Sequence, residues 1–352
     1  MSRKIAIVGG GPAGIFCAIR LLDLEPKIQI TIFEKDSILK TLLPTGGGRC
    51  NLSYNENNIK DFATNYPRGE KFLYSVLNNF NINETIEYFK KIGIETYTQK
   101  DNRIFPISNS SKDVKEKLLN KIRNKVKIIK KEIKKTSELE EFDKVIIATG
   151  GHSGYKIAEE IGHNIVETTP SLHGYITNEK YPAGVSVKIN NDNILFTHDG
   201  VSGPYIYKHS SIHAYDKYPR KILVQIINKE ILKQIIKDNP KKSFGNIVST
   251  LIPKSLAKVI VKNFDKQCAQ VTNKEIEEII YLNFTATSAD KKGEIVTAGG
   301  VNLKEIDKNC KSKINKKYYF IGEVLDIDGY TGGFNLQNCW STASSVALDI
   351  TK

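Results

Sequence analysis

Residues 4–14, with the sequence KIAIVGGGPAG, decide the fold of this chain. An apolar stretch typical of a buried parallel strand runs directly into Gly9, Gly11 and Gly14, which stand in GxGxxG register. The first glycine allows a tight turn, the second lets the backbone approach a pyrophosphate, and the third lets a helix pack close to the strand. We therefore predict a strand, a phosphate-binding turn and a helix over about residues 13–24, whose N-terminus points at the phosphates.

A second apolar strand, residues 29–33, ends at an acidic residue. Glu34 stands twenty positions after Gly14. A carboxylate at this place suits the ribose hydroxyls of an adenine dinucleotide and repels a 2′-phosphate. The strand, the helix and the acid together make the fingerprint far more specific than GxGxxG alone.

Three further glycine-rich signals follow at wide intervals. They are KVIIATGG at residues 144–151, YYFIGE at 318–323 and GYTGGFNL at 329–336. The first two end buried-type strands at points where the chain must pass close to a ligand or another backbone. The last opens the C-terminal helix, whose N-terminus could stabilise the negative charge that a flavin gains on reduction. A plain NAD dehydrogenase needs neither of the last two, so the predicted cofactor is FAD.

Two long motifs carry a family resemblance. TGGGRCNLS at residues 45–53 and GEVLDIDGYTGGFNL at 322–336 resemble the BaiN/YhiN-like flavoproteins, also labelled NAD(P)/FAD-dependent oxidoreductases or aminoacetone oxidase family proteins. NRIFPI, FTHDGVSGP and TAGGV, which begin at residues 102, 196 and 297, are weaker matches. The resemblance covers nearly the whole chain. It implies an FAD-dependent oxidoreductase in which the flavin N5 carries the hydride and the protein forms no covalent bond to the substrate.

The expected cofactor contacts follow the glycine signals and the resembled family. The GxGxxG turn would hold the pyrophosphate, the end of the second strand the ribose, and the backbone near Ile133 the adenine. The GGGRCN loop would pass over the flavin ring, and the C-terminal signals would bind the ribityl chain and the pyrimidine edge. The expected residues are Gly9, Gly11, Pro12, Ala13, Gly14, Glu34, Lys35, Gly46, Gly47, Gly48, Arg49, Cys50, Asn51, Ile133, Ala148, Thr149, Gly150, Gly151, Gly322, Glu323, Gly332, Gly333, Phe334 and Asn335.

No catalytic acid or base can be assigned, and four candidates stay open. Arg49 supplies a cation that could lower the pKa of the neighbouring Cys50, although packing is the favoured role of that cysteine. His198, in FTHDG, and Tyr330, in the last glycine signal, could donate protons, but a surface or hydrogen-bonded role is favoured for His198, and packing is the alternative for Tyr330. Asp326 and Asp328 are explained by turn chemistry.

Cysteine usage excludes two classes of protein. The five cysteines (Cys17, Cys50, Cys268, Cys310 and Cys339) form no C-x-x-C pair and no cluster with metal-ligand spacing. We therefore expect no metal site and no flavin-linked disulfide exchange, and the pattern fits a reducing cytoplasm. Cys17, on the first helix, is expected in the core.

The charge balance is strongly basic, with 52 Lys and Arg against 39 Asp and Glu and a formal net charge of +13. Such an excess can indicate nucleic-acid binding. The lysine runs have no interleaved aromatic residues, however, so solvated lysine faces are the favoured interpretation. Residues 127–135, KIIKKEIKK, predict two short half-buried strands. No apolar run is long enough for a transmembrane helix, and no membrane partner is expected.

The predicted architecture is α/β, with an antiparallel β domain and a helical region inserted into a Rossmann-like domain. The FAD-binding domain comprises residues 1–162 and 290–352, the β-rich substrate domain 163–228 and 282–289, and the helical insert 229–281. Helices are expected near residues 70–79, 83–92 and 112–124, and strands at 125–136 and 143–148. The oligomeric state cannot be inferred.

The predicted activity is hydride transfer through FAD to a small unsaturated carbonyl compound, at the expense of NADH or NADPH. Only one GxGxxG is present, so the nicotinamide would be a transient donor without its own Rossmann site. An amine-type oxidase, an RNA-modifying flavoenzyme and a non-catalytic flavin-binding protein remain as alternatives.

Overall fold

The computed structural model describes residues 3–190, 192–290 and 296–352. These residues divide into two compact units. Unit 1 is formed by the residues up to Thr169 together with those from Val296 onward, and unit 2 by the residues between them. Unit 1 is therefore discontinuous in sequence. The strands expected in the β-rich domain and the helices of the predicted insert both belong to unit 2, and their division into separate domains stays a prediction.

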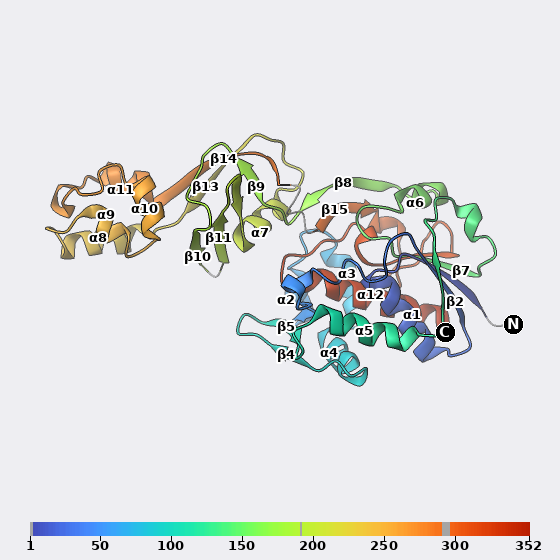
Figure 1. The fold of residues 1–352 in the computed structure, drawn as a ribbon. Coiled ribbons are helices and arrows are strands. Elements are labelled where there is room, and N and C mark those ends of the chain that lie inside the picture. Colours follow the sequence, from blue (N-terminus) through green and yellow to red (C-terminus); the bar gives the residue numbers. More distant parts are fainter. Residues whose placement is uncertain (1–2, 191, 291–295) are drawn as a thin grey trace. The chain divides into compact units, whose positions relative to one another are not determined.

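A five-stranded parallel sheet forms the centre of unit 1 (Figure 1). The GxGxxG strand β1 lies between β2 and β7, and the order across the sheet is β16-β7-β1-β2-β6. The central strands are apolar because both of their faces are covered; Ile5 and Ile146, for example, are fully buried. The bounds are β1 Lys4–Val8, β2 Gln29–Glu34, β6 Lys127–Lys130, β7 Lys144–Ile147 and β16 Tyr318–Phe320.

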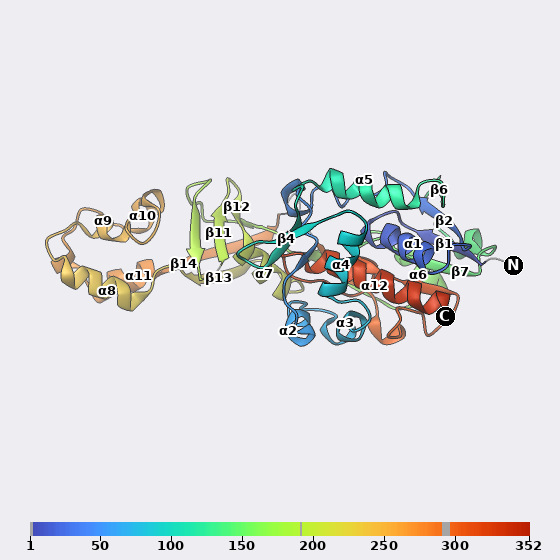
Figure 2. The same ribbon diagram turned by 90° about the horizontal axis from the view of Figure 1, so that it is seen from below.

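Two helices from opposite ends of the chain pack along each other beside this sheet. Helix α1 (Pro12–Leu24) and helix α12 (Phe334–Thr351) lie side by side in Figures 1 and 2. The fully buried Trp340 packs against Phe16 of α1 and Phe89 of α4, with ring centroids 5.0 and 5.2 Å apart. The C-terminal helix is thereby part of the same hydrophobic core as the first βαβ unit.

The remaining elements of unit 1 surround this core. A small antiparallel sheet has the order β3-β5-β4, and β8 pairs with β15. The bounds are α2 Ile59–Ala63, α3 Glu70–Leu77, α4 Ile82–Lys91, α5 Ser111–Ile122, α6 Tyr155–Ile161, β3 Ser53–Tyr54, β4 Thr96–Thr98, β5 Arg103–Pro106, β8 Ile165–Ser171 and β15 Val296–Val301.

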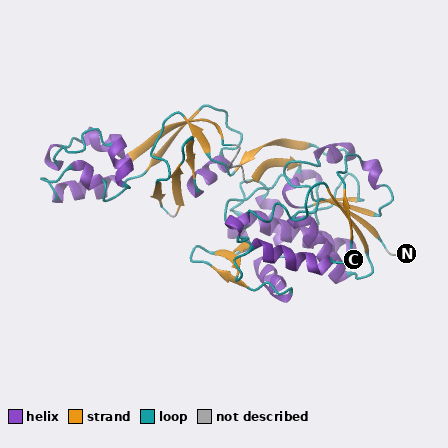
Figure 3. Cartoon of the chain, in the orientation of Figure 1, coloured by secondary structure: helices purple, strands orange, loops and turns teal. Residues whose placement is uncertain are grey.

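Unit 2 has its own core beneath an open antiparallel sheet of order β10-β11-β12-β9-β14-β13. Strand alternation is clear in β13, where Ile222 and Val224 are buried and the residues between them are exposed. Helices α8–α11 form a separate group beyond these strands in Figure 3. The bounds are β9 Tyr175–Thr177, β10 Ser186–Ile189, β11 Asp192–Phe196, β12 Gly200–Ser202, α7 Pro204–Ile212, β13 Arg220–Gln225, α8 Lys229–Asp238, α9 Phe244–Val248, α10 Lys254–Ile260, α11 Asn273–Ile280 and β14 Tyr281–Ala289.

The α/β class, the discontinuous Rossmann-like domain and the inserted antiparallel sheet are confirmed. The prediction of strand structure through residues 125–136 is wrong, because β6 ends at Lys130. Its neighbour β2 ends at Glu34, which pairs with Lys130, so a longer β6 would have no partner. Among the described residues, no helix combines the length and the apolar character that spanning a membrane requires.

Candidate cofactor site

Two glycines of the GxGxxG turn are required by close packing. Gly9 has a φ of +111°, and a Cβ there would lie 2.3 Å from the carbonyl oxygen of Ala148 at the end of β7. A Cβ at Gly14 would lie 2.0 Å from the carbonyl oxygen of Gly9. No side chain fits at such distances, so the turn brings β1, β7 and α1 together as the motif predicts.

Gly11 differs from both because its backbone is unstrained and its side-chain position is open. Its φ is −76°, and the nearest neighbour of a Cβ would be Thr41 Oγ1 at 3.8 Å. It is the N-cap of α1 and supplies no side-chain cap, and Pro12 begins the helix. The open space at the uncapped N-terminus of a 13-residue helix fits a phosphate group.

Glu34 ties the end of β2 to the glycine turn. One carboxylate oxygen accepts the backbone N–H of Gly10 and the other that of Asp36, both at 2.7 Å. Each oxygen keeps a lone pair for a further donor. The neighbouring Lys35 forms an ion pair with Glu132 across 3.4 Å, and Ile133 is buried just beyond it. Glu34, Lys35 and Ile133 are thus grouped at one edge of the sheet.

The segments that end in ATGG and in IGE lie close to each other and to the GxGxxG turn. Glu323 Oε1 accepts the backbone N–H of Thr297 at 2.8 Å, and a Cβ at Gly151 would lie 2.8 Å from the same oxygen. Gly322, with a φ of +71°, faces Ala13, and its Cβ would lie 3.0 Å from that of Ala13. Between Ala148 and Gly151, the Thr149 hydroxyl donates to the Ser153 carbonyl at 2.6 Å, and Gly150 also has a positive φ. Thr297 belongs to the TAGGV motif but was not among the expected cofactor residues.

The last glycine signal forms the turn before α12. Gly333 is the N-cap of α12 with a φ of +101°, and a Cβ there would lie 2.5 Å from the Ser53 carbonyl oxygen. The Asn335 amide accepts the N–H of Gly329 and donates to its carbonyl, both at 2.8 Å. Phe334 is buried among three aromatic rings, those of Tyr54, Phe62 and Tyr66. The side chains of Phe334 and Asn335 therefore stabilise the turn, which also contains Gly332.

The GGGRCN loop packs against β5. Gly46, Gly47 and Gly48 all have positive φ, and a Cβ at Gly46 would lie 2.8 Å from the Phe105 ring. The Arg49 guanidinium lies 4.2 Å from the centroid of that ring, and its Nε donates to the Gly46 carbonyl at 3.2 Å.

Asn51 follows in the same loop and is 7% exposed. Within the part of the chain that the structure describes, its buried Oδ1 accepts no hydrogen bond. A buried amide oxygen without a donor is costly and fits a site where a bound ligand supplies the donor.

Cys50 does not have the lowered pKa that its neighbour Arg49 suggests. The thiol is fully buried, and burial raises its pKa to about 12. The guanidinium is held by the Phe105 ring and the Gly46 carbonyl instead. Cys50 is therefore a protonated packing residue at neutral pH, as is Cys17, whose complete burial confirms its place in the core.

The two remaining catalytic candidates belong to different units of the chain. His198 is exposed in the turn between β11 and β12 of unit 2. Tyr330 is half-buried in the turn before α12, where its N–H donates to the Asn65 carbonyl at 2.9 Å.

No group of three metal-binding side chains occurs among the described residues.

Turn chemistry, which the sequence suggests for Asp328, does not account for this residue. Its carboxylate is fully buried and forms a two-pronged ion pair with Arg68, which is 260 positions away. Burial raises the pKa of the neighbouring Asp326. No sequence pattern joins Arg68 to Asp328.

Unit 2 contains a second polar cluster that the sequence did not reveal. The Tyr175 hydroxyl and His209 Nδ1 are 3.0 Å apart, and the tilted rings of His209 and His213 have centroids 4.4 Å apart. The Arg220 guanidinium lies over Tyr175 and Tyr218. Burial, with the nearby His213 and Arg220, lowers the pKa of His209 to about 4. The imidazole of His209 is therefore neutral at pH 7.

Comparison with known proteins identifies the class of protein that these features define. The family described as HI0933-like protein Rossmann domain matches residues 3–349. The chain belongs to this family and is an FAD-dependent oxidoreductase. The resemblance drawn from the glycine-rich motifs is thereby confirmed.

Individual relatives span the whole chain. It is 27% identical, over an alignment 403 positions long, to a ribosomal RNA dihydrouridine synthase of Haemophilus influenzae, covering 98% of both chains. It is 27% identical, over an alignment 404 positions long, to a 3-dehydro-bile acid delta(4,6)-reductase of Clostridium scindens, covering 97% of both. Among solved structures, 3-ketosteroid delta1-dehydrogenase from Sterolibacterium denitrificans aligns with a TM-score of 0.51 and 10% identity, over 99% of this chain and 100% of that one, which shows a shared fold.

Proposed function

We propose that this protein uses FAD to reduce a carbon–carbon double bond conjugated to a carbonyl group, with NADH or NADPH as the transient electron donor. One observation carries the proposal: relatives that match the chain over its full length are named for reactions of this chemical class. Dihydrouridine is uridine with its C5–C6 double bond saturated, and that bond is conjugated to the C4 carbonyl. The 4,6-double bonds of a 3-oxo steroid are conjugated in the same way.

The geometry of unit 1 supports a specific placement of the cofactor. The open position at Gly11 and the N-terminus of α1 would bind the pyrophosphate. Glu34 would accept hydrogen bonds from the ribose hydroxyls, and the backbone around Ile133 would face the adenine. The segment from Ala148 to Gly151, together with Glu323, would line the nucleotide on the other side of the turn.

The GGGRCN loop and the turn before α12 would hold the flavin end. FAD, when bound, supplies a site that accepts a hydride from one substrate and delivers it to another. Gly46–Gly48 leave the backbone free of side chains, as a planar ring requires, and the unpaired Oδ1 of Asn51 can accept a ring N–H. Arg49 keeps guanidinium donors beyond the single one that it gives to Gly46, and would orient the carbonyl oxygen of the substrate.

We take a uracil in ribosomal RNA as the substrate. The sequence analysis favoured a small molecule, but a net charge of +13 suits a polyanion, whereas a neutral enone gains nothing from it. A small unsaturated carbonyl compound remains the second candidate, favoured by the equal identity to the Clostridium scindens reductase. A cytoplasmic location is also proposed, supported by five cysteines that are all free thiols.

The proposal is tested by flavin reduction and reoxidation under anaerobic conditions. The holoprotein is mixed with NADH and NADPH in turn, and then with unmodified transcribed ribosomal RNA or with a 4,6-dien-3-one steroid. We expect rapid bleaching of the flavin band by one nicotinamide, recovery of the band with RNA, and a gain of two hydrogens on uracil by mass spectrometry. Recovery with the steroid alone would replace the RNA substrate by the second candidate. Reduction by an amine without nicotinamide would indicate an oxidase, and a flavin that none of these reduces would indicate a binding protein.

A further inference from the structure

The basic charge of this chain is concentrated on one helix and the strand that follows it. Residues 112–135, which include most of α5 and all of β6, contain eleven Lys and Arg against three Asp and Glu. A second lysine-rich segment, residues 229–281 of unit 2, contains ten Lys against six acids over more than twice the length, and residues 308–317 contain five Lys and no acid. The α5–β6 segment therefore has the largest excess of cations of the three.

Few of these cations are neutralised. Lys117, Lys131 and Lys134 form ion pairs with Asp113, Glu138 and Glu132. The other eight have no ion-pair partner among the described residues: Lys112, Lys115, Lys121, Arg123, Lys125, Lys127, Lys130 and Lys135. We call these eight residues the α5–β6 basic surface. Clustered unpaired cations create a positive potential that attracts polyanions over long distances.

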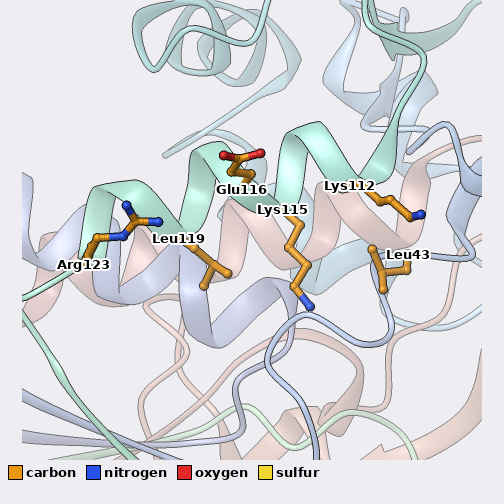
Figure 4. A pocket seen from close by; sticks show the side chains of 6 residues that line it. All are labelled: Leu43, Lys112, Lys115, Glu116, Leu119 and Arg123. Atoms are coloured by element: carbon orange, nitrogen blue, oxygen red, sulfur yellow. The ribbon is translucent and has the colours of Figure 1, made fainter.

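A hollow of about 320 Å³ lies within this surface (Figure 4). It is lined by Leu43, Lys112, Lys115, Glu116, Leu119 and Arg123. In Figure 4, Lys115 and Leu119 extend to one side of α5, and Glu116 points to the other. The volume is at the lower end of the range of small-ligand pockets, enough for one sugar–phosphate unit. Three cations around such a hollow provide donors for a phosphate, and Leu119 and Leu43 provide apolar contact for a sugar.

We infer that the α5–β6 basic surface binds the phosphate backbone of the RNA substrate; this inference rests on the proposed function. The surface has no aromatic side chain on which bases could stack, so it contacts phosphates and does not read sequence. An anionic membrane is less suitable, because Val114, Leu118 and Ile122, three of the four apolar residues of α5, are buried in the core, and the helix presents only the partly buried Leu119 to lipid.

The test compares two fourfold variants of the holoprotein. The first, called the α5 variant, replaces Lys112, Lys115 and Lys121 of α5 and its C-cap Arg123 by Gln. The matched control replaces Lys233, Lys237, Lys254 and Lys258, which are exposed on α8 and α10 and form no ion pair within the described chain, also by Gln. The probe is a fluorescently labelled single-stranded poly(U) RNA, with binding measured by anisotropy from low to moderate salt.

We expect the α5 variant to bind the RNA at least tenfold more weakly than the wild type at low salt. The slope of log affinity against log salt should fall by about 3, since each phosphate contact on a single strand contributes about 0.7. The control should retain most of the affinity and slope. Flavin content and the rate of flavin reduction by nicotinamide should be unchanged in both variants, which would show that the holoprotein is intact.

Equal losses of RNA affinity in the two variants, or no loss in the α5 variant, would overturn the inference. The proposed function would still stand if the wild type saturates uracil in RNA. A wild type that neither binds poly(U) nor reduces RNA would overturn the RNA substrate as well. Binding of phosphatidylserine vesicles that is lost in the α5 variant, with RNA binding unchanged, would assign the surface to a membrane instead.

Discussion

Unit 1 and unit 2 carry their polar chemistry in different ways. In unit 1, backbone segments far apart in sequence approach so closely that only glycine fits, as at Gly9 against Ala148 and at Gly333 against Ser53. In unit 2, the polar cluster consists of side chains, with Tyr175 in contact with both His209 and Arg220. Close backbone approach leaves a glycine pattern in the sequence, whereas a side-chain cluster leaves none. A cofactor site of the first kind can therefore be recognised from its glycine spacing.

The largest effect is expected at the glycine turn of unit 1. Gly11→Val should abolish FAD binding, because the new side chain would occupy the space at the N-terminus of α1 without straining a backbone whose φ is −76°. Gly14→Val should instead prevent folding of unit 1, because even its Cβ would overlap the Gly9 carbonyl. Flavin absorbance of the purified proteins and circular dichroism separate the two outcomes.

The Gly11 variant should keep a native circular dichroism spectrum and lose its yellow colour. Stoichiometric FAD in this variant would place the phosphate elsewhere. A normally folded Gly14 variant would contradict the close approach of α1 to the glycine turn.

The buried ion pair of unit 1 should be the next most sensitive feature. Arg68→Met leaves the fully buried Asp328 carboxylate without this partner and should lower the free energy of unfolding by about 3–5 kcal/mol. Trp340 is the single tryptophan and lies in the core of unit 1, so its fluorescence during urea denaturation reports on this unit.

Lys262→Met is the control for that experiment. Lys262 and Glu278 form an exposed ion pair in unit 2, and its loss should change the Trp340 transition by less than the error of the measurement. A small effect of Arg68→Met would mean that Asp328 is accommodated without its ion pair.

A smaller effect is expected from the GGGRCN loop. Arg49→Ala should keep bound FAD but slow flavin reoxidation by substrate at least about tenfold, which corresponds to roughly 1.4 kcal/mol of transition-state stabilisation. Stopped-flow absorbance of the flavin band measures the rate. Arg49→Lys, which keeps a cation, should recover part of it, and unchanged rates in both variants would place the loop away from the reaction centre.

The smallest effect concerns the pH dependence of unit 2. Burial lowers the pKa of His209 to about 4 from an ordinary value near 6.5, so the unfolded chain takes up a proton before the folded one does. The folded state of unit 2 is therefore most stable, as far as His209 is concerned, above about pH 6.5, and it loses stability as the pH falls toward 4. His209→Gln should flatten this pH dependence of the stability of unit 2, which hydrogen exchange of β9 and α7 measures. A profile identical to the wild type would show that His209 is not the group responsible.

Much of unit 1 could be predicted from sequence because its rules are local. The strand–turn–helix of residues 4–24, the acid at Glu34 and the helix after Gly333 each follow from neighbouring residues. What could not be predicted depends on distant partners. The Arg68–Asp328 ion pair joins segments with no shared pattern, and the burial of Cys50 depends on the packing of its loop into the core of unit 1. Similarly, β6 stops at Lys130 because its partner β2 ends there, which the alternation of KIIKKEIKK does not show.

The most direct test of a cofactor site built from the glycine signals of unit 1 is to identify what the purified protein carries. Acid should release a non-covalent flavin from the yellow protein, and chromatography against standards should identify it as FAD at about one per chain. FMN alone, or no flavin after reconstitution with FAD, would contradict the assignment of the Gly11 turn, Glu34 and the GGGRCN loop to a single dinucleotide.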